Sequence, residues 1–138
     1  MTTIAWDGET LAADSQLTGG DFVYQQNDKK IFNVNGHLVA MAGDDGQCWQ
    51  FLDWYRNPDQ DYPDKLDDMG ALAITKRGAF EYGSCKIPTK IKPPFAIGTG
   101  SAFAMGAMLH GASAAEAVDI ACKLDKYSSK PIKTARLR

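Results

Sequence analysis

The sequence predicts an α+β fold in which antiparallel hairpins and helices occupy separate stretches of the chain. The first observation is a pair of hairpin turns, Asp7-Gly8 and Asn35-Gly36, each lying between short apolar runs. The second is the presence of apolar residues at helical spacing in three segments, at 47–56, 101–109 and 113–124. Strands and helices do not alternate one by one, so this order favours a layered sandwich over a doubly wound parallel sheet.

The length and composition indicate a single domain, residues 1–138, that folds without a metal or a disulfide. A chain of 138 residues can bury roughly two-thirds of its unfolded surface. The three cysteines, Cys48, Cys85 and Cys122, form neither a CxxC pair nor an even disulfide set, and the two histidines are His37 and His110. This spacing argues against a structural zinc site. We expect no metal and no cofactor.

The charge and hydropathy patterns bear on location and partners. The sequence has no charged and apolar leader and no apolar run of membrane-spanning length, so we expect a cytoplasmic protein without a membrane partner. The net charge of −2 argues against general nucleic-acid binding, and the lysine-rich segment 123–138 contains a single aromatic residue, Tyr127. The acidic segment 53–68 and this basic segment either form two solvated faces or have a binding role. In the second case, the two segments attract each other between neighbouring subunits, or the basic segment binds an acidic partner.

The N-terminal half is predicted to form two hairpins followed by a helix. In the first hairpin, the returning strand carries Asp14 back toward Thr2. A polar loop through Gly19-Gly20 then leads to the second hairpin. The helix stops before Pro58, and its aromatic residues cover more than one face, which predicts a core face and a possible subunit-interface face. The predicted strands span 2–6, 10–15, 30–34 and 37–42, and the predicted helix spans 47–56.

The C-terminal half is predicted to form a third hairpin, a short buried strand, two helices and a final strand. An acidic loop over 57–68 joins it to the first helix. Three prolines mark 85–94 as an extended connection, because proline lacks the N–H that a central strand needs. A capping box, Ser113 to Glu116, begins the last helix. The predicted strands span 71–75, 79–82, 95–97 and 131–137, and the predicted helices span 101–109 and 113–124.

The first residues of the chain contain a candidate nucleophile. Thr2 is small enough for Met1 to be removed, which would leave a residue with both a hydroxyl and a free α-amine. An α-amine titrates at about 7.7–8.0 when unperturbed, so near neutrality it can accept the hydroxyl proton as a general base. The turn Gly98-Thr99-Gly100 is a weaker signal, since it lacks the longer glycine pattern of a phosphate loop and fits a tight strand-to-helix turn.

Five short motifs, taken in order, carry a family resemblance. They are TTIAWDGETLAADS, KKIF, VAMAGDDGQC, AIGTGSAFAMGAM and LDKYSSKPIKT. Together they cover most of the chain, which resembles a proteasome β-type subunit of the N-terminal-nucleophile hydrolase superfamily. That group includes the bacterial peptidase HslV and short proteasome-like proteins of phage and prophage genomes. Each motif alone is weak, whereas the ordered set is specific.

The resemblance implies a set of seven catalytic residues, which are Thr2, Asp14, Lys30, Gly43, Thr99, Asp125 and Ser128. It makes Thr2 the nucleophile of a threonine-type peptidase, Asp14 and Lys30 its supporting ion pair, and the Gly43 amide the oxyanion donor. The last three residues would hold and orient the α-amine. The lysine ammonium would favour the threonine alkoxide. The alternative is that Asp14 and Lys30 form a buried pair that only stabilises two hairpins.

The resemblance also implies a four-layer αββα sandwich and a homo-oligomer that cleaves peptides or unfolded proteins. Two departures from the family pattern stand out. The chain passes from the helix at 47–56 to Ala71 without the second long helix that the family usually has, so one helix is shortened or missing. This puts ring assembly and an ATPase partner in doubt. Thr99 stands where the family commonly has serine. A catalytically silent proteasome-like binding module is the alternative function.

Overall fold

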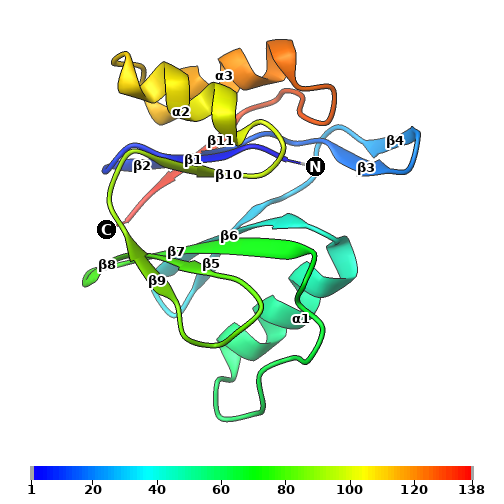
Figure 1. The fold of residues 1–138 in the computed structure, drawn as a ribbon, viewed down its shortest axis with the longest axis vertical. Coiled ribbons are helices and arrows are strands. Elements are labelled where there is room, and N and C mark those ends of the chain that lie inside the picture. Colours follow the sequence, from blue (N-terminus) through cyan, green and yellow to red (C-terminus); the bar gives the residue numbers. More distant parts are fainter. Residues whose placement is uncertain (1, 138) are drawn as a thin grey trace.

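Two antiparallel sheets lie face to face in the computed structural model, which describes residues 2–137 (Figure 1). The first sheet has the strand order β10-β1-β2-β11, formed by β1 (Ile4–Trp6), β2 (Thr10–Ala13), β10 (Phe95–Ile97) and β11 (Lys133–Arg136). The second has the order β5-β6-β7-β8-β9, formed by β5 (Ile31–Val34), β6 (His37–Gly43), β7 (Met69–Thr75), β8 (Gly78–Tyr82) and β9 (Thr89–Ile91).

Helices cover the outer faces of both sheets. Figure 1 shows α2 (Ser101–Leu109) and α3 (Ala114–Leu124) above the first sheet, and α1 (Asp45–Arg56) below the second. The α3 helix begins with the predicted capping box, in which Ser113 Oγ accepts from the Glu116 amide and the Glu116 carboxylate accepts from the Ser113 amide. The predicted α+β class is therefore confirmed, with three helices and antiparallel sheets over residues 2–137.

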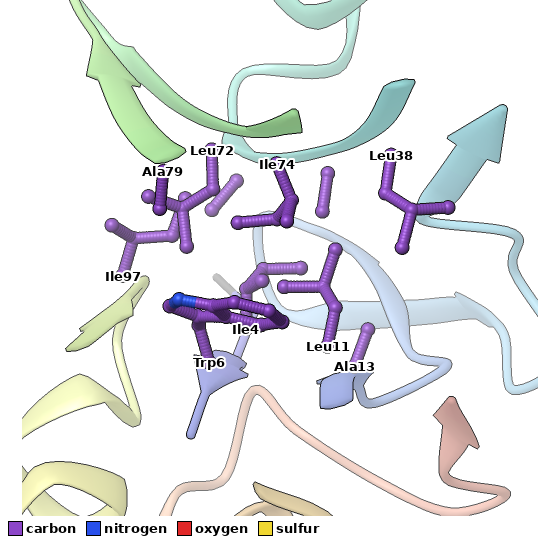
Figure 2. Packing of buried hydrophobic residues seen from close by; sticks show 11 residues of the cluster. Ile4, Trp6, Leu11, Ala13, Leu38, Leu72, Ile74, Ala79 and Ile97 are labelled. Atoms are coloured by element: carbon purple, nitrogen blue, oxygen red, sulfur yellow. The ribbon is translucent and has the colours of Figure 1, made fainter. Parts of the chain in front are cut away.

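The core between the sheets follows from the two-residue period of the strands. Ile4 and Trp6 of β1 and Leu11 of β2 point between the sheets, where they meet Leu72 and Ile74 of β7 (Figure 2). The intervening residues of the first sheet point the other way, toward α2 and α3, and those buried there are alanines: Ala5, Ala12 and Ala96. Small side chains on that face let the two helices lie close to the sheet.

The predicted hairpin turn at Asn35-Gly36 is confirmed, since both residues have positive φ angles, of 53° and 84°. It pairs Val34 with His37 and joins β5 to β6. The predicted polar loop through Gly19-Gly20 is wrong in part, because β3 (Leu17–Gly19) and β4 (Phe22–Gln25) form a separate two-stranded sheet there. Its strands are short and none of their residues is buried, so the alternation that marks a half-buried strand is missing.

The segment predicted as an extended connection, 85–94, also contains a strand. Its residues Thr89–Ile91 form β9, which pairs with β8 at the edge of the second sheet. Pro88 and Pro93 lie just outside this strand. An edge position accommodates neighbouring prolines because one side of an edge strand has no ladder bonds to make.

The outer layer below the second sheet holds α1 and the loop after it. The described chain passes from Arg56 through the acidic loop to β7 without a second helix. Two loop side chains cover the sheet in its place: Leu66 is buried, and the Tyr62 ring lies 4.7 Å from that of Trp54. Tyr62 also donates a hydrogen bond to the Gly83 carbonyl at 2.7 Å. Among residues 2–137, no helix is both long and apolar enough to cross a membrane.

Candidate active site

Thr2 lies just before β1 and lines a cleft of about 500 Å³ beside the β3–β4 hairpin. Part of the lining comes from β6 and the start of α1 and includes Met41, Gly43 and Cys48. Lys30, which precedes β5, also lines the cleft and contacts Thr2. Thr2 is 4 % exposed and Lys30 6 % exposed, so both functional groups lie largely out of bulk water.

The Thr2 hydroxyl is held by a buried ion pair. Lys30 Nζ donates to Thr2 Oγ1 and lies 2.8 Å from Asp14 Oδ1. The Asp14 carboxylate also accepts hydrogen bonds from the backbone amides of Thr3, Gln16 and Ser129 at 3.0–3.1 Å. These contacts fix the carboxylate and compensate its burial. A pair that served stability alone would not require the additional bond to the threonine hydroxyl.

The Thr2 backbone nitrogen is held by a second network of hydrogen bonds. It donates to Thr99 Oγ1 at 3.2 Å, and Thr99 in turn donates to Asp125 Oδ2 at 2.7 Å. Ser128 Oγ donates to the same carboxylate oxygen at 2.6 Å, and the Tyr127 amide donates to Oδ1 at 3.2 Å. Because an ionised carboxylate only accepts hydrogen bonds, the Thr99 hydroxyl proton points at Asp125. The oxygen lone pairs of Thr99 are thus left to face the Thr2 nitrogen.

The turn from β10 into α2 packs closely against the backbone of Thr2. Gly98 has a φ of 97°, and a Cβ there would lie 2.0 Å from the Thr2 carbonyl oxygen. The Gly100 amide donates to the same oxygen at 3.3 Å. The turn therefore serves a close approach of two backbones, which explains why position 98 is glycine.

Gly43 ends β6 and lines the cleft. Its φ is 120°, and a Cβ would meet the Asp68 carbonyl oxygen at 2.3 Å, so the position accepts only glycine. The next residue, Asp44, caps α1 by accepting from the Gln47 amide at 3.0 Å. The structure therefore brings Gly43 into the same cleft as Thr2. Its role as an oxyanion donor stays a prediction.

The structure brings all seven predicted site residues to one place. Six are joined by hydrogen bonds, and Gly43 shares the cleft wall. Sequence reasoning missed Thr3, whose hydroxyl lies 2.7 Å from Ser128 Oγ. The signal for Thr3 was available: side chains alternate along an extended segment, so the residue after a cleft-facing Thr2 must face the helices.

The cleft lining also contains a cysteine thiol, that of Cys48. Burial, with Asp45 and Asp44 nearby, raises the pKa of the Cys48 thiol to about 12, which leaves it neutral at physiological pH. Within the described part of the chain, no group of three His, Cys, Asp or Glu side chains could hold a metal ion. Thr2, by contrast, lines the cleft and has the Lys30 ammonium beside its hydroxyl.

Comparison with known proteins gives matches in structure alone. No protein-family model matches the chain, and no curated protein sequence matches it. The structure of Thiobacillus denitrificans BPH, a bacterial proteasome homologue, matches with a TM-score of 0.74 and 21 % identity, covering 99 % of this chain and 98 % of that one. The same values hold for that protein in complex with epoxomicin. HslV from Trypanosoma brucei matches with a TM-score of 0.76 and 17 % identity, covering 97 % of both chains.

These matches cover 97–99 % of this chain. The chain therefore has the proteasome β-type fold of N-terminal-nucleophile hydrolases.

Proposed function

We propose that this chain is an N-terminal threonine peptidase, an amide hydrolase whose nucleophile is Thr2 after removal of Met1. The observation that carries the proposal is the position of Lys30 Nζ, which bonds to Thr2 Oγ1 and to Asp14 Oδ1 at once. A buried ammonium beside a hydroxyl stabilises the alkoxide and disfavours a charged amine next to it. Both effects favour the pairing of a hydroxyl nucleophile with an amine base.

The reaction would begin with transfer of the Oγ1 proton to the free amine of Thr2. Oγ1 then bonds to the carbonyl carbon of the substrate, and the C–N bond breaks as the amine passes its proton to the leaving nitrogen. Water hydrolyses the resulting threonine ester and returns a proton to Oγ1. Thr99 would orient the amine throughout, because its hydroxyl proton is committed to Asp125.

We propose that the backbone amide of Gly43 donates a hydrogen bond to the oxyanion of the tetrahedral intermediate. Support comes from its place on the cleft wall and from its lack of a side chain. A backbone N–H at a glycine can approach a developing oxyanion closely, and one such donor typically contributes about 10²–10³ in rate.

We propose peptides or unfolded proteins as substrates and a homo-oligomer as the working form. The apolar walls of the cleft, including Phe32, Met41 and Trp49, suit an extended peptide with apolar side chains. Large apolar side chains also lie exposed outside the cleft, among them Phe22 at 72 % and Leu109 at 71 %. In the proposed homo-oligomer, further copies of the chain would cover such side chains. We assign no ATPase partner.

Intact-mass spectrometry tests the proposal. Protein made in its native cell type should lack one methionine mass, and incubation with an epoxyketone such as epoxomicin, which BPH binds in its complex, should add one inhibitor mass. The epoxyketone reacts with hydroxyl and amine together, so Thr2→Ala should remove the adduct. Peptide mapping should place it on the N-terminal peptide. Retention of Met1 would rule out the amine-base mechanism. Processing without labelling, and without cleavage of a peptide library, would favour a silent binding module.

A further inference from the structure

We propose that Thr3 is a positioning residue that ties the amine-side network of Thr2 to its lysine-side network, an inference that rests on the proposed function. Thr3 is fully buried, and both its side chain and its backbone make contacts that lead to the nucleophile. Its side chain does not line the cleft, so it acts through other residues.

The side chain of Thr3 ends a directed chain of hydrogen bonds. Ser128 Oγ gives its proton to Asp125 Oδ2 at 2.6 Å. Its contact with Thr3 Oγ1 at 2.7 Å must therefore be accepted by Ser128 and donated by Thr3. The chain runs from Thr3 through Ser128 to Asp125, and from the same carboxylate oxygen through Thr99 to the Thr2 nitrogen. Hydrogen bonds in such a buried chain strengthen one another.

The backbone of Thr3 makes the second connection. Its amide donates to Asp14 Oδ1 at 3.0 Å, and its carbonyl accepts from the Asp14 amide at 3.1 Å. Asp14 holds Lys30, which holds the Thr2 hydroxyl. One residue thus sets the separation between the group that orients the amine and the group that orients the hydroxyl.

Gly100 supplies an independent observation. A Cβ at this position would lie 1.9 Å from Thr3 Oγ1, far inside contact distance. The Gly100 φ of −89° is negative and lies in a region that residues with a Cβ also adopt, so the backbone conformation does not require glycine here. The space is kept for the Thr3 hydroxyl, because the next nearest atoms, Ala121 Cβ and Asp125 Oδ2, lie at 3.1 and 3.2 Å.

If Thr3 positions the reacting groups of Thr2, removing its hydroxyl should slow the chemical step and leave substrate binding unchanged. Thr3→Val keeps the shape of the side chain but removes the proton donated to Ser128. We expect kcat to fall about tenfold, the size of one buried hydrogen bond expressed as a rate, with KM within about twofold of wild type, since Thr3 is away from the cleft. Thr3→Ser restores the hydroxyl and should return kcat to within about threefold.

Steady-state kinetics on a fluorogenic peptide, with a melting curve for each variant, tests this. Thr75→Val is the matched control, because Thr75 Oγ1 bonds only within the β7–β8 turn, to Gly78 O and from the Arg77 amide. It should leave kcat unchanged. A folded Thr3→Val enzyme with wild-type kcat would overturn the proposal, as would a Thr3→Ser enzyme no faster than Thr3→Val.

A double-mutant cycle tests the same role of Thr3 without requiring that the Thr3→Val variant fold. Gly100→Ala alone should lower kcat at least about tenfold by displacing the Thr3 hydroxyl. In a Thr3→Ala background the space is free, so adding Gly100→Ala should lower kcat by less than about threefold. The contacts with Ala121 and Asp125 are common to both arms and cancel. Equal losses from Gly100→Ala in the two backgrounds would show that Gly100 does not act through Thr3, and would contradict the inference.

The two proposals fail in different ways. A processed wild-type protein that neither labels nor cleaves peptides contradicts the proposed function. A wild-type enzyme that is active, with Thr3→Val behaving as Thr75→Val does, contradicts the role of Thr3 alone.

Discussion

Lys30 Nζ lies 2.8 Å from Asp14 Oδ1, and the side chains of this pair are 5 % and 0 % exposed. Removing one partner of a buried pair leaves an uncompensated charge, and this typically costs about 3–5 kcal/mol. The pair therefore links the folding of the first hairpin and of β5 to the placement of the Thr2 hydroxyl.

Lys30→Ala should abolish turnover and lower the free energy of unfolding by about 3–5 kcal/mol. Lys30→Met keeps more of the side-chain volume, and pairing it with Asp14→Asn removes both charges together. The double variant should be inactive because it lacks the ammonium. Its asparagine offers one accepting oxygen in place of two to the amides of Thr3, Gln16 and Ser129, so its stability should also stay below that of wild type. Thermal melts beside a peptidase assay measure both effects. A folded Lys30→Ala protein with wild-type turnover would refute the assigned role.

The candidate site residues could be named from the sequence because five motifs in order resemble one family, although each motif alone is weak. Asn35-Gly36 fixes a hairpin, and the short motifs around Asp14 and Lys30 each sit where a strand begins or ends. The residue types agree with the roles, because a lysine ammonium favours a threonine alkoxide and an aspartate can pair with that lysine. The structure adds the distances that join these motifs into one network.

Other features depend on contacts between distant segments. The β3–β4 hairpin escapes prediction because Gly19-Gly20 has the composition of a loop and the strands have no buried face. The role of Gly100 depends on the register of β1 against β10, which brings it to Thr3 across nearly a hundred residues of sequence. No local pattern determines that register.

The three cysteines should differ in their reactivity toward iodoacetamide at pH 8. Cys85 is exposed and should be alkylated first. Burial, together with nearby carboxylates, raises the pKa of Cys122 to about 11 and that of Cys48 to about 12, so few thiolates form at either site. Peptide mapping over time measures the order, and denatured protein, in which all three should react alike, is the control. Labelling of Cys48 as fast as Cys85 would contradict the burial of the cleft wall.

Asp7 should make the fold sensitive to acid. Partial burial raises the pKa of Asp7, but hydrogen bonds from the Thr10, Ala114 and Glu9 amides, with Arg136 nearby, outweigh it and leave the pKa below the ordinary 3.8. A lowered pKa stabilises the fold above the unfolded value, and this stabilisation is lost as the pH falls through the folded value. Asp7→Asn should therefore lower the free energy of unfolding by about 1–2 kcal/mol at pH 7.

Urea titrations of wild type and Asp7→Asn between pH 7 and pH 3 measure this difference. It should be constant above about pH 5 and shrink below about pH 4, where the wild-type carboxylate is protonated as well. Asp21→Asn is the control, because Asp21 lies exposed in the turn between β3 and β4. A difference that does not change with pH would show that the charge of Asp7 contributes nothing.

The proposed homo-oligomer should form through apolar contacts assisted by charge. Trp49 on α1 is 50 % exposed although its neighbours Phe51 and Trp54 are buried, and Leu124 at the end of α3 is 61 % exposed. Aromatic residues are enriched at interfaces, and opposite charges on the 53–68 and 123–138 segments would steer assembly.

Light scattering after size exclusion should give a mass that is a multiple of the chain mass. Trp49→Gln or Leu124→Gln should reduce it if that residue is in the interface, whereas Lys65→Gln, an exposed change in the acidic loop, should alter only the salt dependence. A strict monomer at tens of micromolar, at low and at high salt, would contradict self-association and leave these side chains as ordinary exposed apolar surface.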